Sequence, residues 1–164
     1  KLFRWHYKFR HRHLLRKSMS EVVKFQCTLG TTSSAAPLSF EALLNGQSVF
    51  KLDHVTDNCQ VTFDIPDTDD TKQTLQLVMS GKTTEHTQID DQGNITADAM
   101  LTIDTVSIDG VDITQLLNQT AEYAHDFNGT QDPTKDKFYG AMGCNGTITL
   151  EFTTPFYLWL LEHM

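Results

Sequence analysis

The sequence predicts an all-β protein, an antiparallel β-sandwich or jelly roll with an extended basic N-terminal arm. Three observations lead to this fold class. Apolar and polar residues alternate in several short runs, the pattern of strands with one buried and one solvated face. Asn-Gly, Asp-Gly, Pro and Gly separate these runs, and such residues favour tight turns. No long stretch has the apolar spacing of an amphipathic helix.

The first half of the chain contains four alternating runs that predict strands: Val23–Leu29, Phe50–Leu52, Val61–Ile65 and Leu75–Met79. Residues 30–37 have the composition of a flexible loop. Residues 40–44 fit either a short strand or one helical turn, and Asn45-Gly46 then provides a hairpin turn. Because Pro66 lacks a backbone N–H, it marks the end of the third run.

The next segment begins with an alternation that keeps one phase from Ile95 to Ile103 and predicts a strand with one buried face. Past Asp104 the phase shifts, which predicts a bulge or a bend. Asp109-Gly110 is a further turn, and residues 113–117 can start a short helix. Residues 123–140 read as one long loop region because Gly and Pro interrupt them.

The C-terminal stretch contains the clearest strand and the most apolar run of the chain. Asn145-Gly146 predicts a hairpin turn, and the alternation from Thr147 to Thr153 predicts the closing strand of a sheet, which Pro155 ends. The run 156–161 is too short to cross a bilayer, which takes roughly 20 residues. It is therefore expected in the core of the fold, against a partner subunit or against a ligand.

The length of 164 residues fits one domain, which we expect to be residues 19–164 after an arm of residues 1–18. The arm carries seven Lys or Arg residues and no acidic residue, whereas the remainder carries six basic and 21 acidic residues. Such an asymmetry suggests an anionic partner for the arm or docking of the arm on an acidic surface. Three widely spaced cysteines leave open one disulfide with a free thiol or three thiols: Cys27, Cys59 and Cys144.

Aromatic and cationic residues alternate in the arm, so an extended conformation would present one aromatic and one cationic face. The arm could add to a sheet edge of a neighbouring subunit, bind single-stranded nucleic acid or lie on an anionic membrane. It could also be a leader outside the functional domain, since Met19 resembles a translation start. Together with the apolar C-terminal run, it supplies the candidate interface residues Phe3, Arg4, Trp5, Tyr7, Phe9, Arg10, Phe156 and Trp159.

Two clusters could bind ligands. The first is the acidic segment 64–71, where Asp67, Asp69 and Asp70 could supply oxygen ligands to calcium or form a solvated turn. The second lies in the long loop region and combines aromatic, imidazole, carboxylate and amide groups. Aromatic rings can stack on sugar rings, and carboxylates or amides can bind sugar hydroxyls. The candidate ligand-binding residues of this cluster are therefore Tyr123, His125, Asp126 and Asn128.

No catalytic motif stands out. The sequence contains no G-x-S-x-G, no P-loop and no dinucleotide fingerprint. Four N-x-S/T sequons are a consequence of the Thr-rich strand composition unless the protein is secreted by a eukaryote. We therefore expect a protein that is not an enzyme.

Residues 101–112 have a strand-and-turn sequence pattern, which a long Asn/Asp-rich loop and a closing strand follow. In this arrangement the chain resembles calcium-dependent carbohydrate-binding modules of β-sandwich type. That resemblance implies Asp and Asn ligands on loops, at the places of Asp126 and Asn128, and calcium as a cofactor. The strand-turn-strand 145–156 with its aromatic tail is similar to small virion-associated proteins of tailed bacteriophages, which implies a structural or adhesive role. Both resemblances cover about residues 95–161.

The predicted function is a non-enzymatic structural or adhesive module of a virion or extracellular assembly, whose arm docks on neighbouring subunits. The alternative is a calcium-assisted carbohydrate-binding module with a glycan as its partner.

Overall fold

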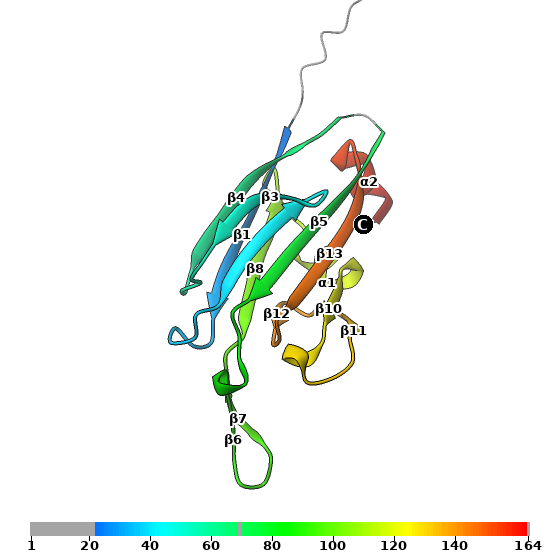
Figure 1. Cartoon of the computed structure of the whole chain (residues 1–164). Coiled ribbons are helices and arrows are strands. Elements are labelled where there is room, and N and C mark those ends of the chain that lie inside the picture. The colour runs from blue at the N-terminus through cyan, green and yellow to red at the C-terminus, as the bar shows by residue number, and fades with distance from the viewer. Residues whose placement is uncertain (1–21, 69, 164) are drawn as a thin grey trace, which may run out of the picture.

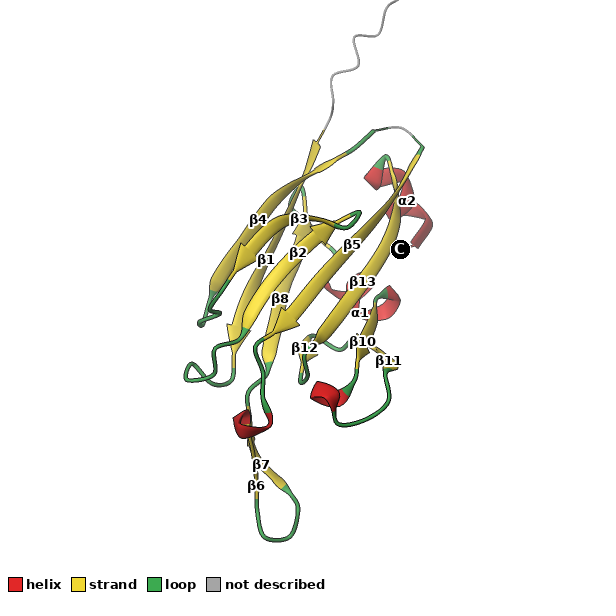
Figure 2. Ribbon diagram, viewed as in Figure 1, coloured by secondary structure: helices red, strands yellow, loops and turns green. Residues whose placement is uncertain are grey.

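The computed structural model describes residues 22–68 and 70–163, and it confirms the antiparallel β-sandwich. Two antiparallel sheets face each other across one core, and two short helices lie at one side (Figures 1 and 2). The arm of residues 1–18, with all its predicted interface residues, lies outside the described part of the chain. Within the described residues, no helix is both long and apolar enough to span a membrane.

The first sheet has the strand order β12-β8-β1-β4, with β9 paired to β8 beyond this path. Its strands are β1 (Val22–Thr31), β4 (Cys59–Pro66), β8 (Leu101–Ile108), β9 (Val111–Asp112) and β12 (Ala141–Met142). The second sheet has the order β11-β10-β13-β5-β2-β3. Its strands are β2 (Ser39–Leu44), β3 (Gln47–Leu52), β5 (Thr71–Ser80), β10 (Glu122–His125), β11 (Thr134–Lys137) and β13 (Gly146–Thr154).

The core lies between the sheets because the apolar side of each alternating run faces inward. In β1 the buried residues are every second one, and the partner strand β4 shows the same period. Phe25 of β1 stacks on Phe63 of β4 with ring centroids 4.7 Å apart. Each fully buried Phe, Leu or Ile contributes about 1.5–3 kcal/mol of transfer free energy, so this pattern fixes which face of each strand is inside.

The turn chemistry explains two hairpins and a bulge. Asn45 and Gly46 have positive φ values of 51° and 79°, as a two-residue hairpin between β2 and β3 requires. Asp109 and Gly110 do the same between β8 and β9, with φ values of 48° and 77°. The predicted phase shift in β8 is confirmed, because Thr105 has φ 50° and the β1–β8 register shifts opposite it.

The prediction of one strand from Ile95 to Ile103 is wrong. The structure splits it into β7 (Ile95–Asp98) and β8, and β7 pairs with β6 (Thr87–Ile89) in a hairpin that extends beyond the sandwich (Figure 1). Ile95 is 63% exposed although it keeps the alternating phase. The alternation of apolar and polar residues could not reveal that Ile95 is exposed, because it does not show whether a second layer covers the strand. A two-stranded hairpin has no such layer.

The hairpin turn predicted at Asn145-Gly146 is also wrong, because Gly146 is the first residue of β13. A β-carbon on Gly146 would lie 2.4 Å from the carbonyl oxygen of Ala124 and 2.9 Å from the ring of Tyr123. The glycine is therefore needed for the close approach of β10 and β13, and it does not form a turn.

The segment 123–140 is only partly a loop. Parts of it belong to β10 and β11, which pair with each other and extend the second sheet beyond β13. Between them lies a 3₁₀ turn, η2 (Phe127–Gly129), in which Asn128 has φ 58°. The strands are short and polar, so their sequence lacks the apolar alternation that would have predicted them.

Two helices complete the fold. The predicted short helix is α1 (Thr114–Thr120), and the apolar run forms α2 (Phe156–His163). Phe156 and Trp159, which the sequence predicted at an interface, are buried in the core and contact Phe152 of β13. The exposed apolar residues of α2 are instead Tyr157, Leu158 and Leu161.

Candidate ligand-binding site

Several connecting segments gather at the end of the sandwich from which the β6–β7 hairpin extends (Figures 1 and 2). They include the β1–β2 and β3–β4 loops, the excursion between β5 and β8, the β10–β11 loop and the β12–β13 connection. Loops at the end of a rigid sandwich are the usual position for ligand recognition, because they vary without disturbing the core.

An open groove of about 710 Å³ lies over β10, β11 and the start of β13. This volume is within the range of about 300–1,000 Å³ that is typical of ligand sites. Its lining combines small or apolar residues with a few polar ones: Ala124, His125, Asp126, Pro133, Thr134, Lys135, Asn145 and Gly146. We call this surface the β10–β11 groove.

The β10–β11 groove continues in two directions. A second hollow of about 840 Å³ is lined by residues 127 and 129–134, so it shares Pro133 and Thr134 with the groove. A smaller one of about 420 Å³ lies on the outer face of the second sheet and shares Ala124 and Lys135. A ligand bound here could therefore extend along the molecule, as a chain does.

Tyr123 and His125, two of the predicted ligand-binding residues, contribute to the structure of the groove wall. The ring of Tyr123 is buried, and its hydroxyl donates to the carbonyl of Cys144 and accepts from the N–H of the same residue. Burial raises the pKa of Tyr123 to about 12, so this hydroxyl stays protonated. His125 lies 3.0 Å from Asp136 and packs between the rings of Tyr123 and Phe127.

Asn128 and Asp126, the other two predicted residues, have different roles. The amide oxygen of Asn128 accepts the backbone N–H of Asn145 at 2.8 Å, which joins the β10–β11 loop to β13. Asp126 lines the groove, and its Oδ1 accepts the N–H of Gly129 at 3.0 Å. The structure thus brings all four residues to one end of the sandwich, and His125 and Asp126 line the groove itself.

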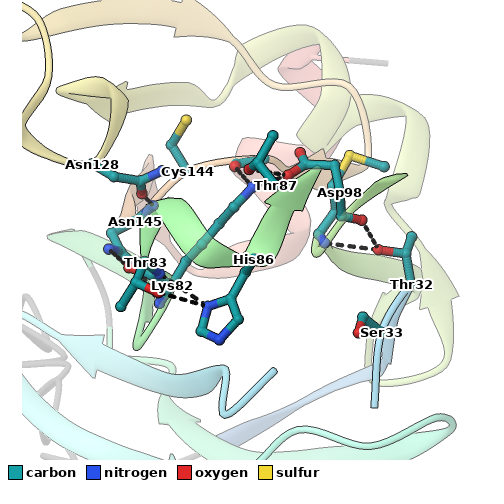
Figure 3. Close-up of polar contacts among 12 residues, drawn as sticks. Thr32, Ser33, Lys82, Thr83, His86, Thr87, Asp98, Asn128, Cys144 and Asn145 are labelled. Carbon is teal, nitrogen blue, oxygen red and sulfur yellow. Dashed lines mark hydrogen bonds and ion pairs between the residues drawn. The ribbon is translucent and has the colours of Figure 1, made fainter. Parts of the chain in front are cut away.

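A buried ion pair that the sequence did not reveal lies at the base of the β6–β7 hairpin (Figure 3). The Lys82 side chain is 2% exposed, and its Nζ donates to Asp98 Oδ1 at 2.6 Å and to the Gly143 carbonyl at 2.5 Å. Asp98 also accepts from the Thr87 hydroxyl at 2.6 Å. The side chain of Asn145 bonds the backbone N–H and carbonyl of Lys82, so the pair connects the hairpin to the groove.

The predicted calcium ligands do not come together in the part of the chain that the structure describes. Asp67 Oδ1 accepts the Phe156 N–H at 2.7 Å and so binds the first turn of α2. Asp70 is exposed with φ 51°, and Asp69 lies outside the described residues. Among residues 22–68 and 70–163, no three His, Cys, Asp or Glu side chains are grouped closely enough to hold a metal ion. The described residues therefore contain no carboxylate cluster of the kind that the sequence predicted for calcium.

The three cysteines are free thiols, which settles the alternatives that the sequence left open. Burial, with the charge of Asp104, raises the pKa of Cys27 to about 12. Burial also raises the pKa of Cys144. A thiol with a raised pKa is a poor nucleophile at neutral pH, so neither residue is suited to covalent catalysis.

Comparison with known proteins identifies the fold. No protein-family model matches the sequence, and no curated protein matches it. One solved structure, the selenomethionine form of vCBM60, aligns with a TM-score of 0.50 at 11% identity, over 77% of this chain and 88% of that one. It is described in connection with circular permutation between two families of calcium-dependent carbohydrate-binding modules.

A second structure, vCBM60 in complex with galactobiose, aligns at 12% identity over 77% of this chain and 95% of that one. Its TM-score of 0.45 is too low to support an argument. At these identities the first alignment establishes a shared β-sandwich fold and nothing about the ligand. It agrees with the resemblance to carbohydrate-binding modules, while the resemblance to bacteriophage virion proteins stays a prediction.

Proposed function

We propose that the protein is a non-catalytic module that binds neutral glycans in the β10–β11 groove. The observation that carries the proposal is the groove itself, an open hollow whose lining includes the small or apolar residues Ala124, Pro133 and Gly146. Small and apolar residues leave room for the apolar face of a sugar ring. Thr134, Lys135 and Asp126 in the same lining can bond hydroxyl groups. The sandwich fold shared with a carbohydrate-binding module adds support.

The charge of the protein favours neutral glycans over anionic ones. Residues 19–164 carry 21 acidic residues against six basic ones. Asp126 and Asp132 lie in the groove and its polar extension, and Lys135 is already paired with Glu122 at 2.9 Å. A polyanion would meet a surface of its own sign, and long-range repulsion would lower its association rate.

The proposal involves no calcium step, because the described residues contain no group of three or more His, Cys, Asp or Glu side chains that could hold the ion. We therefore expect the affinity for glycan to be unchanged in EDTA. A loss of binding in EDTA that added calcium reverses would contradict this expectation.

The test is calorimetry of the full chain with neutral hexasaccharides of galactan, xylan, mannan and glucan type. Ala124→Phe places a ring in the groove from the outer face of β10 and should abolish binding of whichever oligosaccharide binds. Val78→Phe is the matched control, since Val78 lies on the outer face of β5, two strands away in the same sheet. The control should bind normally. Equal binding by wild type and both variants would contradict the proposal.

A role in an assembly is the second candidate, because α2 exposes Tyr157, Leu158 and Leu161, which lie within two turns of one short helix. An exposed apolar group of this kind is typical of contacts with other proteins. We propose that this face, rather than the buried Phe156 and Trp159, would contact a neighbouring subunit of a virion or extracellular assembly. Sedimentation of wild type and Leu158→Glu tests it: an unchanged monomer in both would remove this candidate.

A further inference from the structure

A second cleft lies at the same end of the sandwich, between the β1–β2 loop and the base of the β6–β7 hairpin. Its volume is about 280 Å³, near the lower limit of ligand sites. Its lining is made of small side chains and of side chains that can hydrogen-bond: Thr32, Ser33, Ala35, Ala36, Glu85, His86, Gln88, Ala97, Asp98 and Ala99. We call it the His86 cleft.

His86 is held in one tautomer and has a donor available for a ligand. Its Nδ1 accepts the backbone N–H of Thr83 at 3.0 Å, so the proton of the neutral ring is on Nε2. Among the described residues, none accepts a hydrogen bond from that Nε2–H. In Figure 3 the ring of His86 and the side chain of Ser33 lie on the same side of the Lys82–Asp98 pair. Because Nδ1 is an acceptor, neutral His86 cannot deprotonate Ser33, which favours binding over catalysis.

Hydrogen bonds of Thr32 hold the wall of the His86 cleft in place. The Thr32 hydroxyl donates to the backbone carbonyl of Asp98 and accepts the N–H of Met100 at 2.8 Å. A further backbone bond runs from the Thr32 N–H to the Met100 carbonyl at 3.1 Å. These bonds attach the β1–β2 loop to the start of β8. A cleft whose walls are already bonded to each other loses little conformational entropy when a ligand binds.

The His86 cleft and the β10–β11 groove are joined by one buried network. Asp98 lines the cleft, Asn145 lines the groove, and Lys82 bonds both of them. Figure 3 shows this connection, with Asn145 and Asn128 on one side of Lys82 and Thr32 and Ser33 on the other. The two hollows therefore keep a fixed relation, as two subsites for one extended ligand must.

We propose that the His86 cleft binds a second, neutral sugar unit of the same glycan chain that occupies the β10–β11 groove. His86 Nε2–H and the Ser33 hydroxyl would donate to ring or hydroxyl oxygens of the sugar. Glu85 at the cleft disfavours an anionic unit, which its carboxylate would repel, whereas the charge of Asp98 is compensated by Lys82. This inference rests on the proposed function and adds to it that the ligand is longer than a disaccharide.

The experiment measures the affinities of a disaccharide and a hexasaccharide of the same neutral glycan by calorimetry. His86→Asn keeps an acceptor near the position of Nδ1 for the Thr83 N–H and removes the Nε2 donor. Ser33→Ala removes the hydroxyl, and its neighbour Ser34, which does not line the cleft, gives the control Ser34→Ala. We expect His86→Asn and Ser33→Ala each to weaken hexasaccharide binding about three- to tenfold and to leave disaccharide binding within twofold.

Each outcome decides between the claims. If wild type binds the hexasaccharide and His86→Asn binds it equally well, the cleft inference is wrong and the proposed function stands. If His86→Asn weakens both ligands equally, the cleft is not a subsite for an additional sugar unit, and the inference is again wrong. If wild type binds no neutral oligosaccharide, the proposed function and the inference fail together.

Discussion

Lys82 offers the most informative single perturbation of the fold. Lys82→Met keeps an unbranched apolar stem of four atoms and removes Nζ, which contacts Asp98 at 2.6 Å and the Gly143 carbonyl at 2.5 Å. Removing one member of a buried pair typically costs about 3–5 kcal/mol, because the other charge is left without compensation. Asp98 is 19% exposed and keeps its bond from Thr87, so the lower end applies. We expect a loss of about 3 kcal/mol.

Lys24→Met is the matched control for this prediction. Lys24 Nζ lies 2.7 Å from Asp64 Oδ1, nearly the same distance, but the two side chains are 51% and 55% exposed. An exposed pair contributes about 0–1 kcal/mol, since water and salt screen it. Urea unfolding of both variants gives the comparison. For a domain of this size, 3 kcal/mol also corresponds to a decrease in Tm of about 6–12 °C.

A double-mutant cycle separates the ion pair from the packing of the lysine chain. Asp98→Asn alone and together with Lys82→Met should show a coupling of at least about 1 kcal/mol, because the two groups are in contact. Equal losses for Lys82→Met and Lys24→Met would refute the reasoning. So would additivity within about 0.3 kcal/mol in the cycle.

Three further variants or labels test other parts of the structure. Gly146→Ala should destabilise the fold by about 1–3 kcal/mol, because the new β-carbon would collide with the Ala124 carbonyl. Gly143→Ala is the control, since the atom nearest to its new β-carbon would be 3.9 Å away. This control should unfold at nearly the same urea concentration as the wild type. Asp67→Ala should cost about 1 kcal/mol through loss of the cap on α2; circular dichroism during thermal unfolding measures it, and an unchanged Tm would argue against the cap. Cys27 should resist a thiol reagent at pH 8 until urea is added, because a pKa of about 12 leaves almost no thiolate; rapid labelling of the folded protein would contradict its burial.

The sequence predicted those parts of the fold where local chemistry and burial agree. The alternation in β1, β4, β5 and β13 follows directly from facing a second sheet, and two of the hairpins needed the positive φ that Asn, Asp and Gly permit. Asn145-Gly146 has the same composition and a different role. Its glycine serves a close approach to Ala124, a residue distant in sequence, and local turn preferences carry no information about such a contact.

The candidate site was predicted only by region. The segment predicted as a long loop includes the groove residues His125, at the end of β10, and Asp126, because polar and aromatic groups at a sandwich end are visible in the sequence. The groove floor is different, since Ala124 and Gly146 contribute by being small. The burial of Lys82 could not be predicted either, because a lysine beside a glycine is normally found in a solvent-exposed turn. Lys82 is buried only because it pairs with Asp98 across the base of the hairpin.

A heteronuclear NMR titration of the ¹⁵N-labelled full chain with the hexasaccharide that binds most tightly tests the central claim most directly. Glycan binding in the β10–β11 groove predicts that the amide signals of Ala124, Thr134 and Gly146 shift in a saturable way, while those of α2 stay in place. Shifts confined to α2, or no saturable shift with any neutral glycan of the panel, would contradict the proposal that this end of the sandwich binds sugars.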